Sequence, residues 1–159
     1  MPFPRRGVDI IPENIPLDIL YEDDDIIVIN KPAGMVVHPG HGNYSGTLVN
    51  ALAWHLGADS NFDKNDERGG LLVHRIDKNT SGMLLIAKDD IAHAKLAKQF
   101  FDHTVSRLDT ALVEGRMEAQ DGTIVCNIAR SQSDRMRFKV YEDEEIVKHA
   151  VTHYRLLEE

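Results

Sequence analysis

The sequence predicts an α+β domain with a mixed, largely antiparallel sheet and flanking helices. Short β-like runs are interleaved with only two helical patterns, and their spacing is too irregular for repeating parallel β-α units. A chain of 159 residues, of which 42% are hydrophobic, is long enough to bury a core as one domain. We expect an extended, proline-containing lead-in over residues 1–16 and one domain over residues 17–159.

The first part of that domain is predicted to contain a β-hairpin and a helix. "LDILYEDDDIIVINKP" has two apolar runs around an acidic turn, the second from Ile26 to Ile29. Pro32 and Gly34 end this run, because proline lacks a backbone N–H and glycine accepts a positive φ. We expect "MVVHP" to resume briefly as a strand. In "YSGTLVNALAWHLG" leucines recur every four residues, which predicts a helix that stops at Gly57.

The second part is predicted to contain one more helix and several strands. The apolar run "MLLIA" predicts a strand, and "KDDIAHAKLAKQFFDH" predicts a helix capped by Asp89 or Asp90, with one apolar face formed by Ala92, Leu96 and Phe100. Further strands are expected in "TALVEG", "GTIVCNIA" and "KHAVTHYRLLEE", the first two joined by "GRMEAQDG" through an Asp-Gly turn. The last strand ends before it could find a partner, so we expect an unpaired edge that promotes self-association.

Composition excludes a membrane protein and a disulfide scaffold. No run approaches the roughly 20 apolar residues that span a bilayer, and the first residues lack the apolar core of a secretory signal, so we expect a cytoplasmic protein. Cys126 is the single cysteine, which excludes an intramolecular disulfide and cysteine-rich zinc sites. We expect it to be a small buried side chain.

The distribution of charge is more informative than its sum. A formal net charge of -8 argues against a polyanion as partner. The acidic residues are clustered, however, and the run "ARSQSDRMRFK" contains one acid, Asp134, against four cations: Arg130, Arg135, Arg137 and Lys139. This run is either a phosphate-binding segment or a solvated face.

The stretch "LLVHRIDKNTSGMLLIAK" contains the strongest candidate site. Asp77 lies between Arg75 and Lys78, and nearby cations keep a carboxylate ionised, as a nucleophile or base requires. The strand that follows would hold this loop on a rigid element. The residues before that strand offer hydroxyl groups and open backbone to a ligand: Thr80, Ser81 and Gly82. Alternatively, Asp77 is an Asx-type turn residue that bonds the backbone near Asn79 and Thr80.

These residues resemble a known family. "HRIDKNTSG" is similar to the signature of the RluA/RluD-type pseudouridine synthases, in which the aspartate is catalytic. "YEDDDIIVINKPAGMVVHPG" resembles the family's first motif, with Lys31, Pro32 and Gly34 in their expected places, and "GTLVNALAWHL" and "AKLAKQFFDHTVSR" resemble its two helices. The motifs occur in the right order from about residue 17 to residue 157, so the resemblance implies the pseudouridine synthase catalytic-domain fold.

The resemblance implies an RNA-modifying isomerase. A uridine in ribosomal or transfer RNA would be flipped out of its stack, and Asp77 would let its base exchange an N1 link for a C5 link. No metal, nucleotide or redox cofactor and no obligate protein partner are expected. Arg75 would fill the vacated stack. His74 would shape the loop or be a structural imidazole, and Lys31 either binds RNA or forms a structural ion pair. RNA contacts are also expected from Lys78, Thr80, Ser81, Gly82, Arg130, Arg135 and Arg137.

Two departures from the family pattern lead to an alternative function. Where the family has a tyrosine in a pattern like Arg/Lys-x-Tyr-x-Ala-Leu-Val, "SRLDTALVEG" has Asp109, which cannot stack on a uracil. The family's Thr-Gly-Arg-Thr-His-Gln-Ile-Arg motif, whose arginine holds the catalytic carboxylate, does not occur in the 159 residues. We therefore expect a catalytic domain that is incomplete at its C-terminus and has little activity alone. The alternative is a catalytically impaired RNA-binding fragment.

Two other classes of enzyme fit the residues less well. A kinase-type His-Arg-Asp loop is excluded by Ile76, which separates the arginine from the aspartate, and by the lack of a Gly-rich phosphate loop. A metalloenzyme would use His38 and His41 of "HPGH", but the proline and glycine between them argue against a helical ligand pair. We expect solvent-exposed loop histidines and no metal site.

Overall fold

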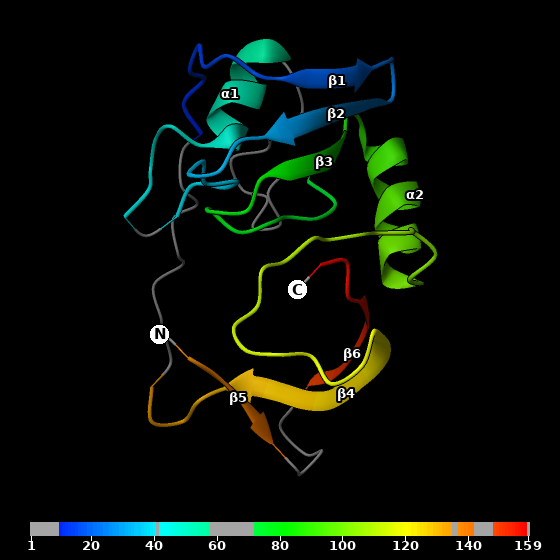
Figure 1. The fold of residues 1–159 in the computed structure, drawn as a ribbon. Helices are drawn as coiled ribbons and strands as arrows, with labels where there is room; N and C mark the ends of the chain where they lie inside the picture. Colours follow the sequence, from blue (N-terminus) through cyan, green and yellow to red (C-terminus); the bar gives the residue numbers. More distant parts are fainter. Residues whose placement is uncertain (1–9, 41, 58–71, 135–136, 142–147, 159) are drawn as a thin grey trace, which may run out of the picture. The chain divides into compact units, whose positions relative to one another are not determined.

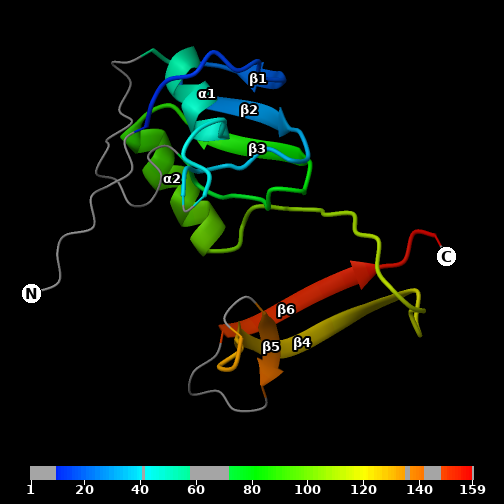
Figure 2. The same cartoon turned by 90° about the vertical axis from the view of Figure 1, so that its left-hand side faces the viewer.

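The computed structural model describes residues 10–40, 42–57, 72–134, 137–141 and 148–158 (Figures 1 and 2). The chain divides into two compact units, Met1–Leu108 and Asp109–Glu159. Each unit has a three-stranded sheet, and every strand pair in the two sheets is antiparallel. Both helices of the described residues belong to the first unit. The predicted α+β class is therefore confirmed.

The first sheet has the spatial order β1-β2-β3 and consists of β1 (Ile19–Glu22), β2 (Ile26–Lys31) and β3 (Gly82–Ala87). The predicted hairpin around the acidic turn is confirmed. Ile29 lies opposite Leu84, and Ile27 lies opposite Ile86. Because successive side chains alternate between the faces of a strand, these four residues share one face, and all four are buried.

Two helices adjoin this sheet. α1 (Leu48–His55) begins with a capping box, in which the Thr47 hydroxyl accepts a hydrogen bond from the N–H of Asn50, and Gly57 follows its end with φ 83°. α2 (Asp90–Phe101) is capped by Asp89, whose carboxylate accepts from the N–H of Ala92 at 2.7 Å. Both helices were predicted from leucine or apolar spacing. Within the described ranges, no helical segment has the length and apolar character that crossing a bilayer requires.

The core of the first unit combines the sheet and both helices. Its buried members are Ile27, Ile29, Val37, Leu48, Leu52, Leu84, Ile86, Ala87 and Ala92. Leu96 of α2 packs against this cluster as a partly buried residue. The predicted apolar face of α2 is therefore the face that meets the core.

The strand expected in "MVVHP" is wrong. Residues 35–39 form no strand. The carbonyls of Val36 and Val37 instead accept hydrogen bonds from the N–H groups of Leu48 and Val49, at 2.9 and 3.1 Å. The first N–H groups of a helix have no partner within the helix, so this segment satisfies the start of α1 rather than a strand. Its apolar pattern is explained by Val37, which is buried in the core.

The second sheet has the order β5-β4-β6 and consists of β4 (Asp121–Arg130), β5 (Phe138–Tyr141) and β6 (Lys148–Arg155). Two of its strands were predicted, but the last one does not end unpaired as expected, because β6 pairs with β4 along its whole length. β5 was missed; it begins at the end of the basic run. The strand expected in "TALVEG" and the Asp-Gly turn are wrong, because Asp121 and Gly122 open β4 itself. Cys126 is half-buried rather than buried.

Gly122 has a packing reason to be a glycine. It lies opposite Tyr154 in the pairing of β4 with β6. A Cβ atom at position 122 would lie 2.7 Å from the hydroxyl oxygen of Tyr154, closer than real Cβ contacts come. The tyrosine ring therefore occupies the space that a side chain on β4 would need.

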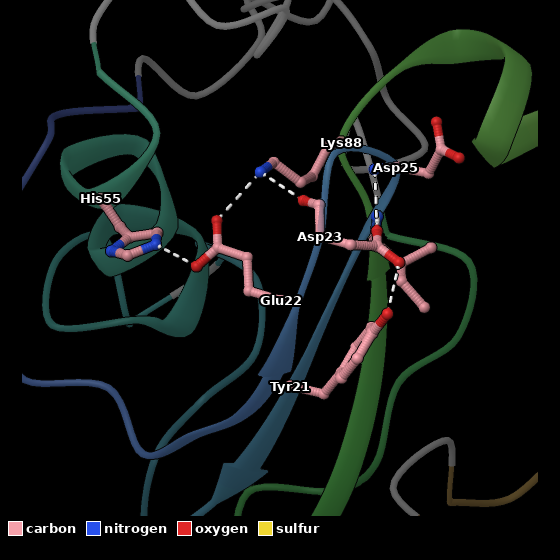
Figure 3. Close-up of polar contacts among 7 residues, drawn as sticks. Tyr21, Glu22, Asp23, Asp25, His55 and Lys88 are labelled. Atoms are coloured by element: carbon pink, nitrogen blue, oxygen red, sulfur yellow. Dashed lines mark hydrogen bonds and ion pairs between the residues drawn. The ribbon is translucent and has the colours of Figure 1, made fainter.

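At the turn between β1 and β2, Glu22 joins three parts of the first unit (Figure 3). Its carboxylate accepts from Nζ of Lys88 at 3.0 Å and pairs with Nε2 of His55 in the last turn of α1 at 2.9 Å. Burial, the largest single influence on this carboxyl, acts to raise its pKa. The contacts with Lys88 and His55 together outweigh burial, so the pKa of Glu22 is lowered.

The turn itself is closed by Asp23 (Figure 3). Its carboxylate accepts from the N–H groups of Ile26 and Asp25, at 2.8 and 2.9 Å, and from the hydroxyl of Tyr21 at 2.8 Å. The hydrogen bond from the backbone N–H of Ile26 lowers the pKa of Asp23 most, and the bond from the hydroxyl of Tyr21 is the next largest cause. The same contact with Asp23 raises the pKa of Tyr21. The acidic run between the two strands is therefore a turn that the hydrogen bonds of the Asp23 carboxylate stabilise.

Candidate active site

Residues 72–82, which contain "HRIDKNTSG" and are called the signature segment below, begin alongside the edge of β3 that β2 leaves open. Leu72 forms an antiparallel bridge with Ile86, and Nε2 of His74 accepts a hydrogen bond from the backbone N–H of Leu85 at 3.0 Å. Because this nitrogen is an acceptor, the neutral imidazole carries its proton on Nδ1. The ring of His74 stacks on Phe100 of α2, with the ring centroids 4.6 Å apart and an interplanar angle of 20°. The start of the signature is thus held by both β3 and α2.

Asp77 lies within this segment, in the loop that leads from His74 to β3, and it is exposed. The turn is closed by its backbone carbonyl, which accepts from the N–H of Thr80 at 3.2 Å. The main chain therefore makes the bond that the Asx-turn alternative assigned to the carboxylate. Gly82 opens β3 with φ 133°, a conformation that disfavours any side chain. The carboxylate of Asp77 is consequently presented at the surface by a defined turn.

Lys31 anchors this loop from the interior. It is fully buried at the end of β2, and burial lowers its pKa. Its Nζ donates to three backbone carbonyls, at 2.8, 2.9 and 3.1 Å, those of Pro32, Met35 and Lys78. An ammonium group has three N–H donors, so these carbonyls use all of them. Lys31 therefore binds the protein's own backbone and has no donor left for a phosphate.

The carbonyl of Lys78 accepts a second hydrogen bond, from a residue close to Lys31 in the sequence. The N–H of Gly34 donates to it at 2.8 Å, and Gly34 has φ 90°, which favours glycine. The loop of residues 32–35 and the loop that carries Asp77 are thus joined at one carbonyl oxygen. Gly34, singled out as a motif residue, has a conformational role in this junction.

Sequence reasoning named Lys31 but left its role open, although a signal was present. In "IIVINK" the side chains of Ile27, Ile29 and Lys31 alternate with exposed or half-buried ones. A period of two places all three on one face of the strand, and the first two are core residues. The position of the lysine in this alternation therefore indicates burial, and a buried ammonium requires acceptors nearby.

The structure brings one group of predicted residues together in the first unit. Arg75, Lys78, Thr80 and Ser81 are exposed, and Gly82 and His74 are half-buried. They surround Asp77 along one continuous segment. The exposed side chains can meet a ligand, whereas that of His74 is engaged with β3 and α2.

The basic run belongs to the second unit. Arg130 lies over the ring of Phe138, with its guanidinium carbon 4.7 Å from the ring centroid. Nε of Arg137 pairs with Asp134 at 3.3 Å. Arg135 lies outside the described residues. Asp109, at the family's tyrosine position, is exposed at the start of this unit.

Metal-binding chemistry finds no support in the described part of the chain, where no group of three or more His, Cys, Asp or Glu side chains could hold a metal ion. Nδ1 of the half-buried His38 lies 2.8 Å from the carbonyl of Pro39, to which it can donate. His41 lies outside the described residues. The His38 ring is therefore engaged with its own loop, and it is half-buried rather than solvent-exposed as expected.

The contribution of α2 to the site was not foreseen. The spacing of Phe100 with Leu96 predicted a core face, but no local pattern indicates that its ring meets His74. His93 of the same helix donates from Nε2 to the carbonyl of Leu72, at 3.3 Å. These contacts join residues more than 20 positions apart, so they depend on the tertiary fold.

With this geometry in view, comparison with known proteins identifies the family. A family model described as RNA pseudouridylate synthase matches residues 25–159, and the chain belongs to this family. Within it, the chain is of the RluA/RluD type. It is 46% identical over 157 residues to ribosomal large subunit pseudouridine synthase D of Zymomonas mobilis, and 47% identical over 146 residues to the protein of that name from Nitrosomonas europaea.

These relatives are longer proteins. The matches cover 99% and 92% of this chain but 48% and 40% of the relatives, so the chain spans about half the length of the curated relatives it matches. The fold is similar to that of human RNA pseudouridylate synthase domain containing 1, with a TM-score of 0.60, 22% identity, and coverage of 87% of this chain and 51% of that one. The resemblance seen in the sequence motifs is therefore confirmed at the level of family and fold.

Proposed function

We propose that the chain forms part of an RNA pseudouridine synthase in which Asp77 acts on a flipped uridine. The observation that carries this proposal is the geometry of one loop. It presents an exposed carboxylate at the surface while its backbone is tied to buried Lys31 on one side and, through His74, to β3 and α2 on the other. Catalytic groups need such support, because a misplacement of about 1 Å can cost about 100-fold in rate.

The reaction is an isomerisation. The N1–C1′ bond of a uridine breaks, the base turns, and a C5–C1′ bond forms, while the proton on C5 is lost to solvent and N1 takes up a proton. Electrons and atoms balance without an oxidant or a second substrate, so the proposal requires no cofactor. The Asp77 carboxylate would serve by attack on the base or sugar or by proton abstraction, and the base must leave its stack to reach it.

The residues around Asp77 would hold the RNA. We propose that Arg75 fills the stack vacated by the base. The exposed side chains of Lys78, Thr80 and Ser81, with the backbone at Gly82, would contact the target nucleotide. In place of RNA contact, we assign Lys31 the positioning of the loop, and His74 the shaping of its start. Phosphates would be bound by the cations of the second unit: Arg130, Arg135 and Arg137.

The proposed substrate is structured RNA, and ribosomal RNA is the first candidate. Two relatives with 46% and 47% identity are named as acting on the ribosomal large subunit. Transfer RNA is the second substrate to test. We further propose that residues 17–159 form one partial catalytic domain, that the protein works in the cytoplasm, and that it needs no obligate protein partner, with self-association through an open sheet edge.

Release of tritium from RNA containing 5-tritiated uridine tests the catalytic proposal, because the C5 hydrogen is lost only when the new bond forms. Because the family's arginine motif does not occur in these 159 residues, we expect only slow release by the chain, and no release above background in Asp77→Asn, which keeps the size of the side chain but removes its charge. Salt-sensitive RNA binding without tritium release would contradict catalysis by this chain and favour the RNA-binding alternative.

A further inference from the structure

We propose that Phe100 of α2 is a positioning residue that sets the location of Asp77 by fixing the imidazole of His74. This inference rests on the proposed function. It adds a residue outside the signature and outside the loop, one that touches neither the reacting atoms nor the nucleotide. The carboxylate of Asp77 is separated from His74 by only two residues, Arg75 and Ile76.

The signature segment is anchored at two points. At the first, Nε2 of His74 accepts from the N–H of Leu85 at 3.0 Å. At the second, the carbonyl of Lys78 accepts from Nζ of Lys31 and from the N–H of Gly34. Asp77 lies between these anchors. If either anchor shifts, the turn that presents the carboxylate must shift with it, since the peptide chain between them is short.

The first anchor requires the imidazole to keep one orientation. A ring that rotates about its own bonds would lose the acceptor facing Leu85, and a single hydrogen bond does not prevent this. The ring of Phe100 covers one face of the imidazole at a centroid distance of 4.6 Å and 20° between planes. Stacked rings at this distance attract one another beyond simple area burial.

Helix α2 is itself firmly placed. Asp89 caps its first turn, Ala92 is buried, and Leu96 packs on the core of the first unit. His93 adds a bond from this helix to the carbonyl of Leu72, at the start of the signature segment. Two turns of α2, through His93 and Phe100, therefore contact the signature segment. Because α2 packs on the core, these contacts restrict the movement of the loop.

The neighbouring residue provides a matched control. Phe101 lies on the same helix, has the same side chain and is 83% exposed. Phe100→Leu removes the stacking ring and keeps an apolar side chain, whereas Phe101→Leu makes the same chemical change at the surface. Phe100→Tyr keeps the ring and is expected to behave like the unaltered chain.

Hydrogen exchange of the backbone amides provides a readout that does not depend on turnover. In Phe100→Leu we expect exchange at Leu85 to accelerate about tenfold or more relative to Phe101→Leu, with Ile27 and Ile29 unchanged. In a tritium-release assay, kcat should fall about tenfold or more, with KM for RNA within about twofold. If Phe100→Leu unfolds the first unit, Phe100→Met replaces it.

The inference is overturned if Phe100→Leu and Phe101→Leu agree within about twofold in both Leu85 exchange and kcat, or if Phe100→Tyr fails to restore them. Asp77→Asn separates this inference from the proposed function. If Asp77→Asn leaves tritium release unchanged, catalysis through Asp77 is wrong. If no variant releases tritium, exchange at Leu85 alone decides whether Phe100 fixes the loop.

Discussion

The two units differ in what lies behind their sheets. In the first, one face of β2 and β3 packs into a closed core with residues of α1 and α2. In the second, the described strands leave large apolar side chains about half exposed or more: Ile124, Val125, Phe138, Val140 and Val151. The buried hydrophobic residues found in the described ranges all belong to the first unit.

This difference teaches where precise chemistry can be located. Close-packed cores resist deformation, so a loop backed by such a core keeps its side chains in place. Asp77 and its two anchors are in the packed unit. The cations Arg130 and Arg137 are in the unit whose stability depends mainly on strand pairing, and phosphate contacts tolerate looser positioning than catalysis does.

If the two units differ in packing, truncation of an apolar side chain should lower the free energy of unfolding much more in the first unit than in the second. Leu84→Ala removes a fully buried side chain of β3 and should lower the free energy of unfolding by about 3–5 kcal/mol. Val140→Ala on β5, where valine is 60% exposed, should change it by no more than about 0.5 kcal/mol. Urea unfolding followed separately in each unit by amide signals measures both. Comparable losses would contradict the difference in packing.

Lys31→Met tests the interior anchor of the catalytic loop. It removes the donor of three part-buried bonds to backbone carbonyls, although the carbonyl of Lys78 keeps its bond from the N–H of Gly34. We therefore expect a loss of about 2–3 kcal/mol and faster amide exchange in residues 32–35 and 78–80. The control is Lys78→Met, because this lysine contributes its backbone carbonyl while its side chain is exposed. A loss in Lys78→Met equal to that in Lys31→Met would refute the anchor.

In the second unit, a smaller effect is expected from Gly122→Ala. The added methyl group would collide with the ring of Tyr154, but this ring is the far end of a flexible side chain and can move aside. We expect a loss of about 1 kcal/mol together with changed ring signals of Tyr154. When Gly122→Ala is introduced into the Tyr154→Leu variant, the further loss in the free energy of unfolding should be small. An alanine penalty that persists without the tyrosine ring would exclude the packing explanation.

The smallest effect is expected from pH. The folded-state pKa of Glu22 is below its ordinary value of 4.5, so its contribution to stability is present above about pH 4.5 and is lost as the pH falls through the lowered value. Asp23 acts in the same direction. As the pH is lowered below 4.5, the melting temperature of the first unit should decrease, and this decrease should be less steep in Glu22→Gln. Identical pH profiles for both proteins would show that the Glu22 network contributes nothing.

Much of the first unit could be predicted because its signals are local. The apolar run in "IIVIN", the cap at Asp89 and the stop at Gly57 each depend on residues close in sequence. "MVVHP" failed because its apolar residues serve a helix start and a core position rather than a strand. In the second unit, Asp121 and Gly122 have turn chemistry, yet the long pairing with β6 overrides it.

The site divides in the same way. Asp77 and its neighbours were found from one contiguous motif, as were the cations of the basic run. The anchors could not be found in full, because the bonds from Lys31 to Lys78 and the stack of His74 on Phe100 join distant parts of the chain. Lys31 had a partial signal in its strand position, whereas Phe100 had none beyond membership of an apolar helix face.

Nucleoside analysis of digested RNA after incubation with the chain or with Asp77→Asn tests the central claim most directly. Pseudouridine and uridine have the same mass but separate by chromatography, so the product itself is counted. We predict that pseudouridine accumulates slowly with the unaltered chain and does not rise above background with Asp77→Asn. Equal amounts of pseudouridine from both proteins would contradict the assignment of the chemistry to this carboxylate.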